Sequence, residues 1–162
     1  MGEVRVVSVS SLSNRVVVGR VFPGTDLIEG ILRICEDHGI SSGSIDLVLG
    51  SLRKFTFVYP IRDDQNKMGV KYCDPVEIDG PIELLCGNGI VGVASSGGKA
   101  LHLHAVVADR NGRVYGGHVL QGNPVLVTVE VVIRELSDVN VIRGLDEETG
   151  FTLFSFSPKG GV

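Results

Sequence analysis

Three of the four histidines in this chain, His102, His104 and His118, fall within a span of 17 residues. Alternation in the segment LHLHA places His102 and His104 on one face of a strand, with Leu101, Leu103 and Ala105 on the other. Imidazole nitrogen suits Zn²⁺ first, and Ni²⁺, Cu²⁺ or Fe²⁺ as well. An isolated histidine is more often a packed or surface group, so a metal site here requires His118 to join the other two.

The position of His118 depends on the turn formed by residues 109–113, Asp-Arg-Asn-Gly-Arg. A two-residue type I′ turn at Asn111 and Gly112 would place His118 opposite Ala105, on the wrong face unless a bulge at Gly116 and Gly117 corrects the register. A type I turn that starts at Asp109, with Gly112 left-handed, would place His118 directly opposite His104. The second turn is favoured because Asp suits its first position and Gly its fourth.

In the favoured register all three imidazoles share one face, with β-carbons of paired residues about 5 Å apart. Three protein nitrogens leave a fourth coordination position open, which is typical of a catalytic zinc site rather than a closed structural one. Gly116 and Gly117 carry no side chains and are expected to leave room for a ligand or water beside the metal.

The glycine run at residues 87–92, GNGIVG, matches the dinucleotide-binding pattern G-x-G-x-x-G. That pattern needs a helix directly after the glycines, because the N-terminus of the helix holds the pyrophosphate. Here the following residues, VASSGG, predict the end of a strand and a turn. The glycines therefore indicate a strand that another backbone approaches closely.

The elements that must position these residues are mostly strands. One helix is predicted at about residues 26–38, where apolar residues recur at helical spacing between a capping Asp26 and a terminating Gly39. Residues 60–68 and 143–150 are expected to be exposed polar loops. The pattern predicts an α+β fold, mainly antiparallel sheet in a partly open barrel, with one main helix. Strands are expected at residues 4–10, 15–21, 44–59, 69–78, 82–94, 100–108, 113–121, 124–136 and 151–156.

Length and composition restrict the class of protein. The 162 residues predict a single domain over 1–162, and 43% hydrophobic with 21% charged residues excludes a disordered chain. Three scattered cysteines indicate reduced thiols, so we expect a cytoplasmic protein, and no apolar run is long enough for a membrane span. The formal net charge of −4 argues against direct binding of nucleic acid.

The segments that carry these features resemble the PPC domain ("plants and prokaryotes conserved"). They are VFPGTDLIEGILRICEDHGISSGSI, IELLCGNGIV and HLHAVVADRNGRVYGGHVLQGNPVLVTVEVVI, and the resemblance covers a core of about residues 15–136. It implies a compact α+β fold assembled as a homotrimer. In prokaryotic members the pattern H-x-H…G-G-H is a metal site, usually with zinc, which maps onto His102, His104 and His118. Plant relatives add AT-hook DNA-binding segments, whose R-G-R-P sequence does not occur here.

Two further residues are candidates for the site. Glu130 would lie near Gly116 if the turn at Gly122 and Asn123 carries an extra residue, and could then orient a histidine from the outer shell. The alternative is a solvated strand residue. Arg20 could contact an anionic ligand, although a surface ion pair is the alternative.

Three functions remain open from the sequence. The first is a metal-binding homotrimeric module, with one divalent ion per chain, zinc first, that binds a small ligand or a protein partner. The second is a metal-dependent hydrolase or lyase that uses the open position, for which Glu130 is the one candidate base. The third is a DNA-binding regulator, direct or through a partner, which the net charge disfavours.

Overall fold

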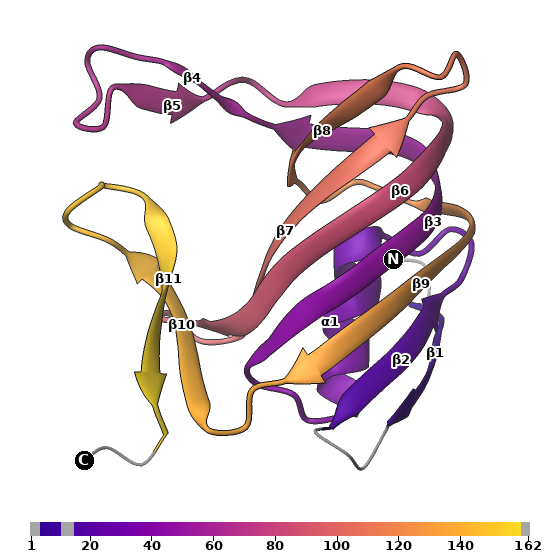
Figure 1. The fold of residues 1–162 in the computed structure, drawn as a ribbon, viewed down its shortest axis with the longest axis horizontal. Helices are drawn as coiled ribbons and strands as arrows, with labels where there is room; N and C mark the ends of the chain where they lie inside the picture. Colours follow the sequence, from indigo (N-terminus) through magenta and orange to yellow (C-terminus); the bar gives the residue numbers. More distant parts are fainter. Residues whose placement is uncertain (1–3, 11–14, 160–162) are drawn as a thin grey trace.

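The computed structural model describes residues 4–10 and 15–159, which form one helix and eleven strands (Figure 1). The helix is α1 (Leu27–Asp37). The strands are β1 (Val6–Ser10), β2 (Val16–Val21), β3 (Gly43–Val58), β4 (Pro60–Arg62), β5 (Val70–Tyr72), β6 (Val76–Ala94), β7 (Lys99–Ala108), β8 (Val114–Val119), β9 (Val125–Glu135), β10 (Val139–Leu145) and β11 (Thr152–Pro158).

Nine strands make one sheet in the order β1-β2-β9-β3-β8-β7-β6-β10-β11, and β4 pairs with β5 separately. An additional pairing of β3 with β6 joins β3, β8, β7 and β6 into a closed circuit of strands. Every pairing among the described strands is antiparallel except that of β6 with β10. The predicted class, mostly antiparallel sheet with one helix, is confirmed.

The helix α1 begins and ends close to the predicted bounds. The carboxylate of Asp26 accepts hydrogen bonds from the backbone N–H groups of Ile28 and Glu29, which makes it the N-cap. The same carboxylate accepts bonds from the N–H groups of Gly122 and Asn123, so it also holds the loop between β8 and β9. Gly39 follows the helix with a φ of +64°, a backbone conformation that favours glycine.

The hydrophobic core lies between α1 and the inner face of the curved sheet. The apolar stripe of the helix is buried, and α1 contacts β1, β2, β7 and β9 (Figure 1). The same core cluster contains inward-facing strand residues, among them Phe55, Leu103, Val107 and Ile133, which are fully or almost fully buried. Outward residues of the same strands are then left to form the site and the surface.

Two segments that the sequence predicted to be loops contain strands. Within 60–68, the residues Pro60–Arg62 form β4, which pairs with β5. Within 143–150, the first residues belong to β10, which pairs with β11 and, in parallel at two positions, with β6. The predicted strand at 151–156 corresponds to β11. The N-terminal hairpin of β1 and β2 is confirmed, and its connecting residues 11–14 lie outside the described residues.

The β4–β5 hairpin and the β10–β11 hairpin project from the same side of the barrel, and we call them the two arms (Figure 1). Their tips are joined, because the Nζ of Lys67 donates a hydrogen bond to the backbone carbonyl of Glu147 at 3.0 Å. Tyr72 and Phe151 meet edge to face between the arms, with ring centroids 6.1 Å apart. No helix in the described part of the chain is long and apolar enough to cross a membrane.

Candidate metal centre

Strand β7 presents His102 and His104 on its outer face. Leu103 and Ala105 alternate with them and point into the core, where 1% and 4% of their surface remains exposed. Burial of these two apolar side chains fixes the pleat, so both imidazoles must point away from the core. The register with β6 pairs His102 with Ile90 and His104 with Asn88.

The turn between β7 and β8 is the one that starts at Asp109. Its backbone N–H donates to the carbonyl of Arg113, and the N–H of Gly112 donates to the carbonyl of Asp109, both at 2.9 Å. The Asp109 carboxylate accepts bonds from the N–H groups of Asn111 and Arg113, and Gly112 has a φ of +75°. His118 therefore pairs with His104, as the favoured alternative predicts, and Gly117 rather than His118 lies opposite Ala105.

The three imidazoles converge on one point. One nitrogen from each of His102, His104 and His118 lies within 4.8 Å of the others, and the Nε2 atoms of His102 and His104 are 3.0 Å apart. The Nδ1 of His118 is buried and has no hydrogen-bond partner. Because an unsatisfied buried polar atom is costly, this donor set fits a metal ion that accepts the imidazole lone pairs.

Burial favours the neutral form of His118 and His102, which is the form that binds a cation. It lowers the pKa of His118 to about 4, and the charges of His102, His104 and Arg143 act in the same direction. Burial also lowers the pKa of His102, with smaller effects of His104 and Arg143. His118 is consequently unprotonated near pH 7, which is the form that binds metal.

Gly117 on β8 serves a purpose that the sequence did not predict, the close approach of a neighbouring strand. A Cβ on Gly117 would lie 2.6 Å from the carbonyl oxygen of Val58 and 2.7 Å from the ring of Phe57. One on Gly116 would lie 3.0 Å from the carbonyl oxygen of Ala105. The missing side chain of Gly117 therefore allows β3 to approach β8 closely and does not serve to leave room above the histidines. This close approach lets β3 pair with β8 at His118.

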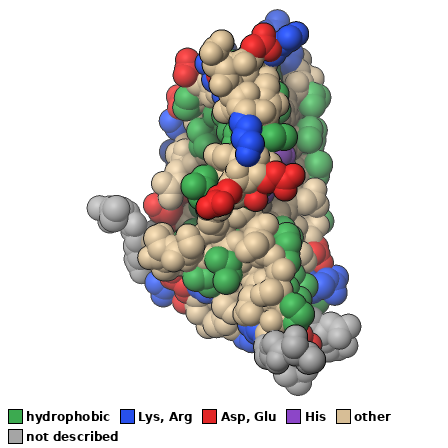
Figure 2. Space-filling view, turned by 90° about the vertical axis from the view of Figure 1, so that its left-hand side faces the viewer, with side chains coloured by type: hydrophobic (Ala, Val, Ile, Leu, Met, Phe, Trp, Pro, Cys, Tyr) green, Lys and Arg blue, Asp and Glu red, His purple; other side chains and the backbone are tan. Residues whose placement is uncertain are grey.

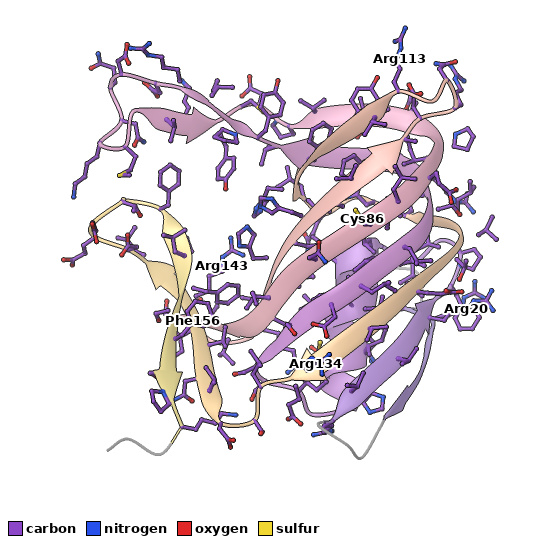
Figure 3. The ribbon with its side chains drawn as sticks, viewed as in Figure 1. Arg20, Cys86, Arg113, Arg134, Arg143 and Phe156 are labelled. Atoms are coloured by element: carbon purple, nitrogen blue, oxygen red, sulfur yellow. The ribbon has the colours of Figure 1, made fainter. Side chains whose placement is uncertain are left out.

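A pocket of about 510 Å³ adjoins the histidines on the side of the two arms. His102 and His118 line it, together with Arg143 from β10 and Tyr72, Phe151 and Leu153 from the arms. Figure 3 shows Arg143 between β10 and the barrel, on the side that faces the arms. The sequence did not single out Arg143, because residues 143–150 were predicted to be a loop.

The structure does not bring Glu130 to the histidines. Glu130 lies on β9, where its neighbours are Arg20 on β2 and Leu49 on β3. The strand β9 does not follow β8 in the sheet but lies on the far side of β3, so the predicted outer-shell role is wrong. Arg20 is exposed next to Glu130, with its guanidinium bonded to the hydroxyl of Thr128 and stacked over Phe22.

Comparison with known proteins agrees with the fold and the motifs. The model of the Plants and Prokaryotes Conserved (PCC) domain matches residues 9–137. The chain belongs to this family. As a PPC-domain protein it also matches two bifunctional GlmU proteins from strains of Synechococcus, at 26% identity over 142 residues and 27% over 139 residues. The matched parts cover 88% and 86% of this chain but 20% of each relative, so the chain spans about a fifth of their length.

Solved structures share the same fold. A metal-containing protein from Archaeoglobus fulgidus is 26% identical with a TM-score of 0.73, and the match covers 96% of this chain and 99% of that one. A plant- and prokaryote-conserved protein from Pyrococcus horikoshii is 22% identical with a TM-score of 0.70, covering 92% and 94%. A proposed DNA-binding protein from Bacteroides thetaiotaomicron is 20% identical with a TM-score of 0.74, covering 92% and 97%.

Proposed function

We propose that this PPC-domain protein binds one divalent metal ion per chain through His102, His104 and His118, with zinc as the preferred ion. The observation that carries the proposal is the convergence of three imidazole nitrogens within 4.8 Å, together with a buried Nδ1 of His118 that has no hydrogen-bond partner. The metal would act as a Lewis acid with at least one open position. The description of the Archaeoglobus relative as metal-containing supports the same assignment.

The module works as a single domain that assembles as a homotrimer and binds a small ligand or a protein partner beside the metal. Apolar side chains on the outer face of the sheet support self-association. Val18 on β2 and Leu47 on β3 both pair with Val132 on β9, and 48% and 38% of their surfaces are exposed. Adjoining exposed apolar residues of this kind are typical of protein–protein contacts.

A metal-dependent hydrolase or lyase is the second candidate, and the pocket beside the open coordination position favours it. Such an enzyme needs a base within hydrogen-bond reach of the reacting water or substrate. Within the described residues the candidate metal cluster contains the three histidines and no carboxylate, and Glu130 is not among them. The binding module is therefore preferred over the enzyme.

Direct binding of DNA is the weakest of the three functions for this chain. Nucleic-acid affinity depends on Lys and Arg that displace counterions from phosphates, whereas the net charge here is −4. The description of the Bacteroides relative concerns that protein. A measured affinity for duplex DNA at moderate salt that falls steeply as the salt concentration is raised would make DNA binding the preferred function.

Substitution of a single ligand tests the metal site. We expect elemental analysis of the purified protein to find about one ion per chain, and His104→Ala to lose most of it while keeping its circular dichroism spectrum. His104 is the exposed member of the cluster, so its removal leaves the core intact. The matched control is His38→Ala, at the C-cap of α1, which should retain the metal. Less than about one ion per three wild-type chains would refute the site.

A further inference from the structure

We propose that the pocket between the barrel and the two arms binds a small organic monocarboxylate with an apolar body. Its carboxylate would lie between Arg143 and the metal, and its body between the arms. The inference deepens the proposed function, on which it depends for the metal ion, by naming the class of ligand that fills the pocket beside the open position.

Arg143 supplies the first half of the anion site. Its Nη1 donates to the backbone carbonyl of Leu101 at 2.9 Å, and its guanidinium lies over the ring of Phe154 at 5.5 Å. These two contacts hold the group in place but use one of its five N–H donors. Among the described residues no carboxylate forms an ion pair with Arg143. The half-buried guanidinium therefore keeps donors for a planar carboxylate.

The pocket places this cation beside the histidines. Arg143, His102 and His118 line the same pocket, so an anion there would meet the guanidinium and the metal together. Lys71 also lines it but pairs with Asp63 at 3.4 Å, which leaves Arg143 as the unpaired cation of the lining. A planar carboxylate would match this arrangement, with one oxygen toward the guanidinium and the other toward the metal.

The rest of the pocket lining is mostly apolar, with Lys71 and Thr152 as its polar members, and favours a hydrocarbon body. Its walls are formed by Val58, Pro60, Tyr72, Leu120, Phe151 and Leu153. Tyr72 contacts both His118, with centroids 5.5 Å apart, and Phe151, which makes an aromatic wall next to the metal site. A mostly apolar cleft with a few convergent polar groups is the usual form of a small-molecule site. Sugars and nucleotides would leave hydroxyl and amide groups unpaired against these walls.

The arms limit the size of the ligand. The bond from Lys67 to the Glu147 carbonyl joins their tips, and the pocket that the arms border holds about 510 Å³. In Figure 2, which looks onto the side of the arms, acidic side chains cross the middle of the face with hydrophobic ones beside them. Water and salt screen the repulsion between these exposed acidic side chains and an anionic ligand. The attraction of a carboxylate held between Arg143 and the metal is screened less.

Titration of the metal-loaded protein tests the inference. Cobalt(II) is loaded in place of zinc because its complexes absorb visible light. The protein is then titrated with phenylacetate, acetate, 2-phenylethanol and inorganic phosphate. The cobalt absorption spectrum and the heat of binding are measured for each compound. Phenylacetate carries both the carboxylate and the apolar body, so it should bind at least roughly tenfold more tightly than the other three compounds and should change the cobalt spectrum. Phosphate binding as tightly as phenylacetate would show a plain anion site and overturn the proposal.

Variants assign the two halves of the site. Arg143→Ala should weaken phenylacetate by roughly ten- to hundredfold, whereas Arg113→Ala, an equal loss of charge at the far end of the barrel, should not (Figure 3). Should Arg143→Ala fail to fold, Arg143→Lys serves in its place, because lysine keeps the positive charge but lacks the planar guanidinium group. Leu153→Ala should weaken phenylacetate but not acetate, with Leu145→Ala, outside the pocket lining, as its control.

The outcomes separate this inference from the proposed function. A protein that binds cobalt while phenylacetate leaves both the spectrum and the heat unchanged overturns the inference and leaves metal binding intact. Equal affinity of the wild type and Arg143→Lys for phenylacetate also contradicts it. A protein that binds no metal at the histidines refutes the proposed function, and with it a carboxylate shared between metal and Arg143.

Discussion

His118 is the residue whose environment differs most from that of a solvated histidine. It lies on β8 opposite His104, contacts the ring of Tyr72, and its buried Nδ1 has no partner. Burial holds its pKa near 4, so the folded apo-protein resists protonation at a position that an unfolded chain protonates readily. This contrast makes stability depend on pH.

We expect the apo-protein to become less stable as pH falls from about 6.5 to about 4. Folding lowers the pKa of His118 from 6.5 to about 4, so the unfolded chain binds more protons than the folded chain throughout this window. The population of unfolded protein therefore rises as the pH falls. Urea unfolding with a chelator present, at pH 7 and pH 5, measures the change. His118→Gln cannot titrate, so the same loss of stability in that variant would exclude His118 as the cause.

At the scale of elements, the antiparallel pairing of β3 with β8 fixes the position of the third histidine. Gly117 lets the backbone of β3 approach, and Val58 then pairs with His118 in the ladder. At the other end of β8, the turn at Asp109 sets the register with β7. His118 is thus positioned by hydrogen bonds on both sides of its strand, without help from a bound ion.

Gly117→Ala should destabilise the protein by about 2 kcal/mol, because the added Cβ overlaps backbone that cannot move without separating two strands. It should also weaken metal binding, since the displaced strand carries His118. Urea unfolding and metal titration measure the two effects. Gly144→Ala is the control, because its Cβ would meet only Ser95 at 3.4 Å. Wild-type metal affinity in Gly117→Ala would show that the pairing of β3 with β8 does not position His118.

The chemistry of the site was predictable where it depended on neighbours in sequence. Alternation around His102 and His104 gives their common face, and the preferences of Asp109 and Gly112 give the register that adds His118. Arg143 was missed because residues 143–150, RGLDEETG, form a polar stretch that predicts a loop, and the pairing of β10 with β6 extends over two positions only. Glu130 was misplaced because the insertion of β9 between β2 and β3 is a long-range choice that no local turn specifies.

At the scale of the molecule, the site and the outer apolar face lie on different parts of the sheet. The histidines belong to β7 and β8 and face the arms, whereas Val18, Leu47 and Val132 belong to β2, β3 and β9. A trimer that buries the second surface would leave the pocket accessible. Assembly and ligand binding are therefore separable by substitution.

Leu47→Lys should convert the proposed trimer to monomers, because it places a charge among the apolar side chains that would pack between chains. Light scattering coupled to size-exclusion chromatography measures the mass, and metal content should stay unchanged. Val114→Lys is the control, since Val114 is an exposed apolar residue next to the turn at Asp109. A monomeric mass for the wild type would refute the assembly, and a trimeric Leu47→Lys would place the contact elsewhere.

The closed circuit of β3, β8, β7 and β6 bears on how the protein would acquire the proposed ion. A zinc finger folds around its metal and unfolds when the metal leaves, whereas here the ligands are already assembled on paired strands. Ions can then exchange at an intact site without a cycle of unfolding. Which ion occupies it follows from relative affinity and from the free concentrations of competing metals at the moment of loading.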